Sequence, residues 1–87
     1  MRTESYEKPK VVKEMAREFT EFMKIHKFKK LPVFKISSIT YNEMLANQDV
    51  FANTLIEAEP KEPGIRGTVY GVWFRVEPDY FGPIKAE

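Results

Sequence analysis

The most strand-like run in the sequence is IRGTVYGVWFRVE, Ile65–Glu77, and the predicted fold is built around it. Its residues alternate between two sides with a period of two, which is typical of a β-strand. The alternation places two sets on opposite faces: Tyr70, Val72, Phe74 and Val76 on one, and Val69, Trp73 and Arg75 on the other. Gly67 and Gly71 interrupt the run and predict a bend, a bulge or a tight hairpin. Pro78 ends it.

A helical period precedes this run near the N-terminus. Apolar positions recur there at steps of three and four, at Val12, Met15, Phe19, Phe22 and His26. Charged residues occupy the opposite side, and a proline at the start tolerates only the first turn of a helix. The pattern predicts a long amphipathic helix over Pro9–Lys27.

Between these two segments the sequence predicts a strand and a short helix. Leu31–Ile36 has strand-like composition, with a proline that suits the start or edge of a strand. Thr40–Glu43 fits a capping box, which predicts a helix beginning at Tyr41. Asp49 is placed to cap a further turn that carries Phe51 and Leu55.

These elements predict one α+β domain over residues 1–87. A long N-terminal amphipathic helix packs on a small, mainly antiparallel sheet, and a short second helix lies between strands. We expect residues 1–8 to be a loose lead-in, residues 60–64 a turn, and residues 79–87 a C-terminal tail.

Composition favours a cytoplasmic protein without a membrane partner. The chain is 43% hydrophobic and 14% aromatic, which provides a core, and its net charge of +1 does not indicate a membrane or nucleic-acid partner. It has no Cys, which favours a reducing compartment. The start of the sequence is too polar for a signal peptide, and no apolar run approaches a membrane span.

The residues give little sign of catalytic or metal chemistry. With one His and no Cys, we expect no metal and no cofactor. His26 continues the helical stripe, where its charge would suit the helix dipole, and no motif supplies a triad around it. Glu57, Glu59 and Glu62 leave a glycosidase-type acid pair open, although a solvated loop is the commoner meaning. We expect a protein that is not an enzyme.

Aromatic residues point instead to binding. Trp73 falls on the strand face opposite Phe74, and so short a chain cannot easily cover both faces of a sheet. Exposed Trp, Tyr and Arg side chains are favoured anchors in protein interfaces. We therefore predict that Trp73, Arg75, Tyr80 and Phe81 bind another protein, either a host factor or a second copy of the chain.

Two alternatives to this hypothesis remain open. The first is nucleic-acid binding by a basic patch made of Lys24, Lys27, Lys29, Lys30 and Lys35. Lysines at a helix C-terminus also complement the helix dipole, and the patch has no Arg for bidentate contacts. The second is self-association through the Val12–His26 stripe, which has heptad-like spacing over too few heptads for a coiled coil.

Two segments resemble a pattern of phage and prophage proteins. They are Pro32-Val33-Phe34-Lys35-Ile36-Ser37, followed by Tyr41 and Met44-Leu45, and Gly67–Val76, followed by Pro78-Asp79. In similar proteins, a strand ending in Ser leads into a Tyr-bearing helix, and a Gly-x-x-x-Gly step leads into a strand ending near Pro-Asp. The pattern covers about half of the chain and carries no catalytic residues. The pattern occurs in small accessory proteins and in a segment of some phage major capsid proteins. A chain of 87 residues is too short for a capsid shell protein, so the resemblance implies a small phage accessory protein in a bacterial cytoplasm.

Overall fold

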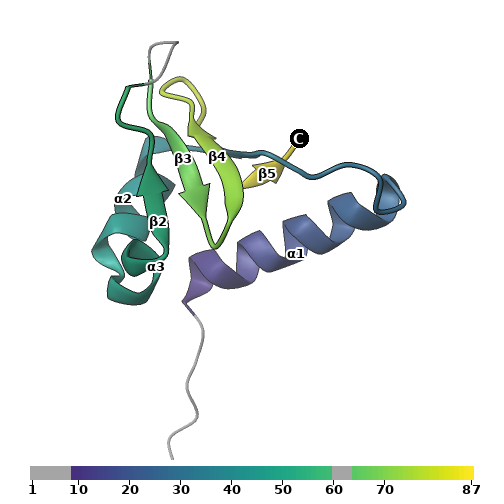
Figure 1. Cartoon of the computed structure of the whole chain (residues 1–87). Coiled ribbons are helices and arrows are strands. Elements are labelled where there is room, and N and C mark those ends of the chain that lie inside the picture. The colour runs from purple at the N-terminus through teal and green to yellow at the C-terminus, as the bar shows by residue number, and fades with distance from the viewer. Residues whose placement is uncertain (1–8, 60–63) are drawn as a thin grey trace, which may run out of the picture.

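The computed structural model describes residues 9–59 and 64–87. The predicted lead-in over 1–8 and residues 60–63 of the predicted turn lie outside them. The elements follow one another in this order (Figure 1): α1 (Lys10–Ile25), β1 (Phe34–Ile36), α2 (Ser38–Ala46), α3 (Gln48–Ala52), β2 (Thr54–Ile56), β3 (Arg66–Val69), β4 (Val72–Val76) and β5 (Lys85–Ala86).

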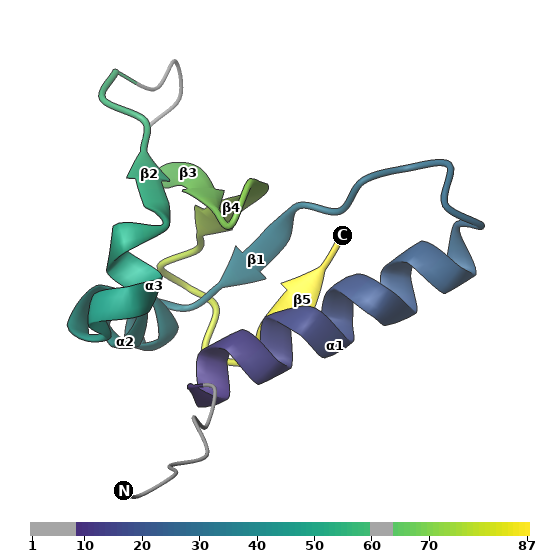
Figure 2. The ribbon, with the colours of Figure 1, turned by 60° about the horizontal axis from the view of Figure 1, so that its bottom comes forward.

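The strands form one five-stranded sheet in the order β2-β3-β4-β1-β5. Only β1 and β4 run parallel, and the other neighbouring strands are antiparallel. The predicted α+β fold is confirmed, including the long first helix, the mainly antiparallel sheet and the helical segment between strands. Figure 2 shows β5 lying between β1 and α1.

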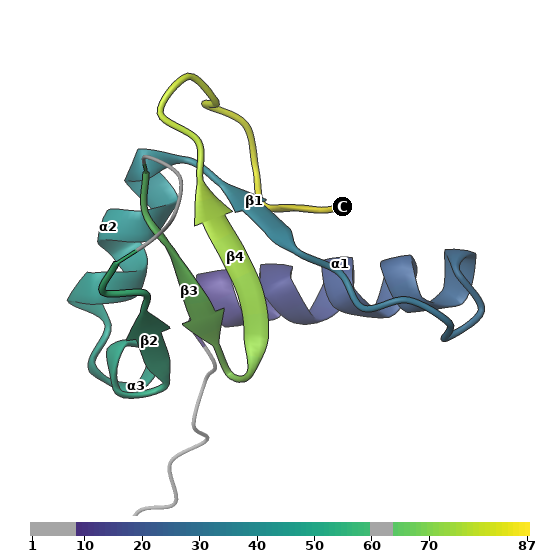
Figure 3. The same ribbon diagram turned by 45° about the horizontal axis from the view of Figure 1, so that its top comes forward.

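The core lies between one face of the sheet and the helices, and it includes Met44 of α2 and Val50 of α3. Val11, Met15 and Phe22 are the buried residues of α1, and Met15 and Phe22 belong to the predicted stripe. The sheet contributes Phe34 and Phe74, which lie directly opposite each other on β1 and β4 and are at most 2% exposed. In Figure 3 α1 lies behind the sheet, so only one sheet face is covered by this helix.

The Ile65–Glu77 run is a hairpin, and this corrects part of the predicted facing. Tyr70 and Gly71 form the turn with φ values of 50° and 79°, the left-handed pair that a tight β-hairpin requires. Because the chain reverses there, Val69 does not share a face with Trp73. It lies opposite Val72 and is buried on the covered side.

Helix starts also differ from the prediction by a few residues. The α2 N-cap is Ser37, whose Oγ accepts a hydrogen bond from the Thr40 amide, so the helix begins three residues before Tyr41. Asn47, not Asp49, caps α3 by accepting from the Val50 amide. More than one residue competent to cap stands in each region, and sequence alone does not choose between them.

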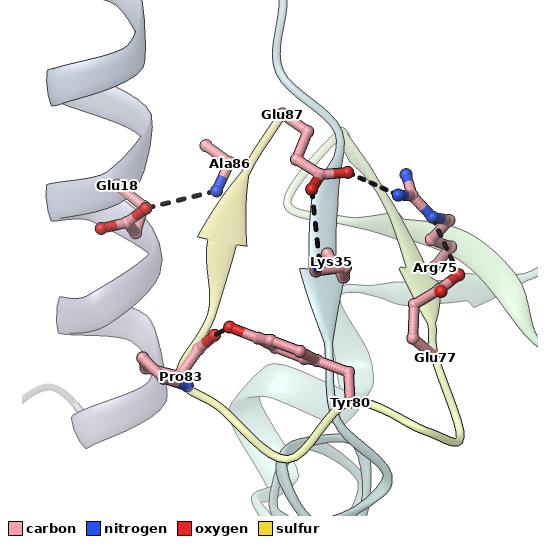
Figure 4. Close-up of polar contacts among 8 residues, drawn as sticks. All are labelled: Glu18, Lys35, Arg75, Glu77, Tyr80, Pro83, Ala86 and Glu87. Carbon is pink, nitrogen blue, oxygen red and sulfur yellow. Dashed lines mark hydrogen bonds and ion pairs between the residues drawn. The ribbon is translucent and has the colours of Figure 1, made fainter.

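The segment predicted as a tail belongs to the folded body. Ile84 is 4% exposed, and β5 pairs with β1 at Ala86↔Phe34 and Lys85↔Lys35. The Glu18 carboxylate of α1 accepts a hydrogen bond from the Ala86 amide at 3.2 Å (Figure 4). This contact ties α1 to the last strand of the sheet.

Candidate binding surface

The sheet face away from α1 presents an apolar row. Cross-strand register places Leu55 of β2 opposite Thr68 of β3, and Thr68 opposite Trp73 of β4. Residues directly opposite in a sheet point to the same side, so the three side chains stand together. Leu55 is 74% exposed and Trp73 is 45% exposed, which confirms that this part of the face is open to solvent.

A basic row runs beside the apolar one. Register aligns one cationic residue from each of four neighbouring strands: Arg66, Arg75, Lys35 and Lys85. We call these four residues, together with Leu55, Thr68 and Trp73, the open face. The two rows meet where the Arg66 guanidinium lies 5.9 Å from the centroid of the Trp73 ring, a cation–π geometry.

Two carboxylates offset the repulsion within the basic row (Figure 4). Glu87 accepts a hydrogen bond from Arg75 Nη2, and its Oε2 lies 3.5 Å from Lys35 Nζ. Glu77 accepts from Arg75 Nε at 3.0 Å. The hydrogen bond with Glu87 raises the pKa of Arg75, and the hydrogen bond from Arg75 lowers the pKa of the Glu87 carboxylate. Arg75 is thereby held in a fixed orientation at the centre of the sheet.

The predicted partner-binding residues fall into two places. Trp73 and Arg75 are two residues apart on one strand and share the open face. Tyr80 joins its margin, because Lys35 Nζ lies 4.4 Å from the Tyr80 ring centroid and the Tyr80 hydroxyl donates to the Pro83 carbonyl (Figure 4). Phe81 is 79% exposed in the loop before β5, out of register with the rows.

The predicted lysine patch is also divided. Lys24 lies in the last turn of α1, and Lys27, Lys29 and Lys30 follow in the turn after it. Lys35 is not with them, since strand alternation turns it to the open face, where it pairs with Glu87. The five lysines therefore do not form the single surface that their sequence spacing predicts.

Other features offer less chemistry. A cavity of about 380 Å³ lies between α1 and the β3–β4 hairpin, and its lining is almost wholly apolar, with Met15, Phe19 and Val72 among the side chains. Of the predicted acid cluster, Glu59 is exposed and Glu62 lies outside the described residues. Over residues 9–59 and 64–87, no group of three potential metal ligands occurs, and no helix is long and apolar enough to cross a membrane.

Sequence reasoning missed Leu55, Arg66, Thr68 and Lys85 as members of the open face. Alternation assigns each residue a side of its own strand, but only the pairing register brings residues of different strands into one row. A signal was available for β3 and β4, because a two-residue turn at Tyr70-Gly71 fixes the register of that hairpin. The positions of β2 and β5 had no such local signal.

The fold and this surface define a small α+β protein whose mixed sheet is covered by a helix on one face. A scan against protein-family models, a search of curated proteins and a search of solved structures each found no match.

Proposed function

We propose that this protein is a non-enzymatic module that binds another protein through the open face. The observation that carries the proposal is the position of Trp73. This is the single Trp of the chain, and it stands half-exposed on β4, inside the sheet and not at its edge. A large aromatic side chain left open at such a site is a typical anchor of a protein interface.

The surroundings of Trp73 have the composition of an interface. Leu55 adds apolar area on one side, and Arg66 lies against the indole ring. Trp, Tyr and Arg are the residues most enriched among those that contribute strongly to protein binding. Arg75 is preorganised by two carboxylates, so that little conformational entropy is lost when a partner contacts it.

The charge pattern supports a protein partner over a nucleic acid. Four cationic side chains are accompanied by Glu77 and Glu87, which already pair with Arg75 and Lys35. A phosphate backbone would meet these carboxylates as well as the cations, which weakens the electrostatic attraction that nucleic-acid binding depends on. A protein surface with both signs of charge complements such a face. If the resemblance to phage accessory proteins reflects ancestry, the partner is a bacterial host protein.

Self-association through α1 is less well supported. Met15 and Phe22 of the predicted seam are buried within the chain, so they are not available to a second helix. A second copy could still bind through the open face.

Site-specific photo-crosslinking tests the proposal. The photoreactive residue p-benzoylphenylalanine replaces Trp73, or Arg17 on the exposed side of α1 as a control, and the cells are irradiated. We expect a discrete crosslinked protein from position 73 and none from position 17. Excess wild-type protein should compete for the crosslink in lysate, whereas Trp73→Ala should not. The same crosslink from both positions, or equal competition by both proteins, would contradict the proposal.

A further inference from the structure

A second surface lies away from the open face, on the segment that connects α1 to β1. Figures 1 and 2 agree that the C-terminal half of α1 and the turn after it extend past the sheet. We call residues 24–31 of this projecting segment the tip. It is a convex end of the molecule, distinct from the open face.

Three large apolar side chains of the tip point into solvent. Ile25 is 75% exposed, and Phe28 and Leu31 are each 73% exposed. Single exposed apolar residues are ordinary, but three within seven positions of one projecting turn are not explained by packing. By contrast Phe22, one turn earlier on α1, is 7% exposed.

Every charge in the tip is positive. Its four lysines are Lys24, Lys27, Lys29 and Lys30, and the sequence has no acidic residue between Glu21 and Glu43. None of the four forms an ion pair with any residue in the part of the chain that the structure describes. Lysines at a helix C-terminus complement the dipole, but this role does not require the apolar residues between them.

The tip is a built turn with strained backbone. The Phe28 amide donates to the Met23 carbonyl at 2.8 Å and the Lys27 amide to the Lys24 carbonyl at 3.2 Å, which together close a Schellman motif. Such a motif normally has Gly at the left-handed position. Here Lys27 and Phe28 adopt φ values of 52° and 61° in succession. Each costs about 1–2 kcal/mol relative to right-handed backbone, and strain of this kind is concentrated at functional sites.

Aromatic packing at the base of the tip holds this geometry. The rings of Phe22 and His26 are in contact, with centroids 4.1 Å apart and a tilt of 34° between the ring planes, and Lys30 Nζ lies 5.9 Å from the Phe22 ring centroid. The turn is therefore anchored to the packed end of α1, and this anchoring holds the exposed side chains of the tip in place.

We propose that the tip binds the surface of membranes that contain anionic lipids. Ile25, Phe28 and Leu31 enter the interface between headgroups and acyl chains, while the lysines remain at the level of the lipid phosphates and carboxylates. The convex shape favours a bilayer over a nucleic acid, since a projecting apolar turn enters a soft layer but offers no groove to a phosphate backbone. The net charge of +1 argued against a membrane partner because it averages the lysines of the tip with acids elsewhere in the chain.

Co-sedimentation of the full chain with lipid vesicles tests this inference. The vesicles are phosphatidylcholine alone, or phosphatidylcholine mixed with phosphatidylserine. We expect binding only to the mixed vesicles, and we expect it to weaken as salt is added. Trp73→Ala should bind as the wild type does, because the open face is not involved.

Matched variants separate the tip from the rest of the surface. Phe28→Ala should weaken binding about tenfold or more, since it removes one inserted ring, whereas Phe81→Ala, at a similarly exposed Phe, should have no effect. Lys24→Ser with Lys29→Ser should weaken binding about 25-fold, from about fivefold per lysine near an anionic surface. The control pair, Lys10→Ser with Lys13→Ser, removes the same charge from the other end of α1.

Three results would overturn the inference. The first is no binding to the mixed vesicles at low salt. The second is an equal loss from Phe28→Ala and Phe81→Ala. The third is that wild type and Phe28→Ala bind duplex DNA equally well while neither binds the vesicles. That result would make the lysines a nucleic-acid site.

Discussion

Two neighbouring residues of β4 should respond very differently to truncation. Phe74 is 0% exposed and faces the core, whereas Trp73 is 45% exposed and faces solvent. Comparing Phe74→Ala with Trp73→Ala therefore measures directly whether only one side of the sheet is covered. Both substitutions remove an aromatic ring from the same strand, so differences in strand propensity largely cancel.

The structure sets the expected size of each effect. Phe74→Ala removes a fully buried ring and leaves a cavity, which should lower the free energy of unfolding by about 3–5 kcal/mol. Trp73→Ala gives up only partial burial, together with a cation–π contact to Arg66 worth about 0.5–1 kcal/mol. We expect a total loss of about 1–2 kcal/mol for Trp73→Ala.

Urea denaturation followed by far-UV circular dichroism is the appropriate assay, because Trp73→Ala also removes the fluorophore. A domain of this length has a free energy of unfolding of about 4–13 kcal/mol. At the lower end of this range, Phe74→Ala leaves the protein marginally stable or unfolded. If it has no folded baseline, Phe74→Leu supplies the comparison with a smaller cavity. A loss for Trp73→Ala as large as that for Phe74→Ala would refute the reasoning, since it would mean that Trp73 is a core residue.

Three further predictions concern the tip, the polar network and the sheet. Lys27→Gly should raise the free energy of unfolding by about 1 kcal/mol, because Gly accepts a left-handed backbone without strain; Lys27→Ala should give no such gain in a thermal melt. The lowered pKa of Glu87 means that its pairing with Arg75 stabilises the fold above the ordinary carboxylate value of 4.5 and that this stability is lost as pH falls through the folded pKa. Melting temperatures of wild type and Glu87→Gln should therefore converge in acid, and curves that stay parallel would count against the pairing. Gly67→Ala would place a Cβ 2.1 Å from the Leu55 carbonyl oxygen, so it should cost about 1–3 kcal/mol and speed hydrogen exchange in β2.

The sequence was most informative where one local rule dominates. The helix over Lys10–Ile25 follows from a sustained period of three and four, and the Tyr70-Gly71 hairpin was among the options that two glycines in a strand-like run allow. The hairpin then corrects the facing of Val69, because a reversal of the chain changes which residues share a side. A single continuous alternation does not carry that information.

Elements that depend on distant partners were harder to predict. Lys85 and Ala86 form a strand because they pair with β1 and because the Ala86 amide donates to the Glu18 carboxylate. The short segment itself has no strand periodicity. The same dependence explains the candidate site. Trp73 and Arg75 could be proposed from their own strand, whereas Arg66 and Leu55 join them only through cross-strand register.

The proposed binding function depends on whether the face that carries Trp73 is open to solvent, and the fluorescence of this single Trp reports on it without a label. The measurement is iodide quenching of Trp73 emission in the free protein and in the complex with the partner captured from position 73. We predict that iodide quenches the free protein readily and that the complex is protected. Emission that iodide cannot reach in the free protein, or quenching that is unchanged in the complex, would contradict the claim that this face is the binding surface.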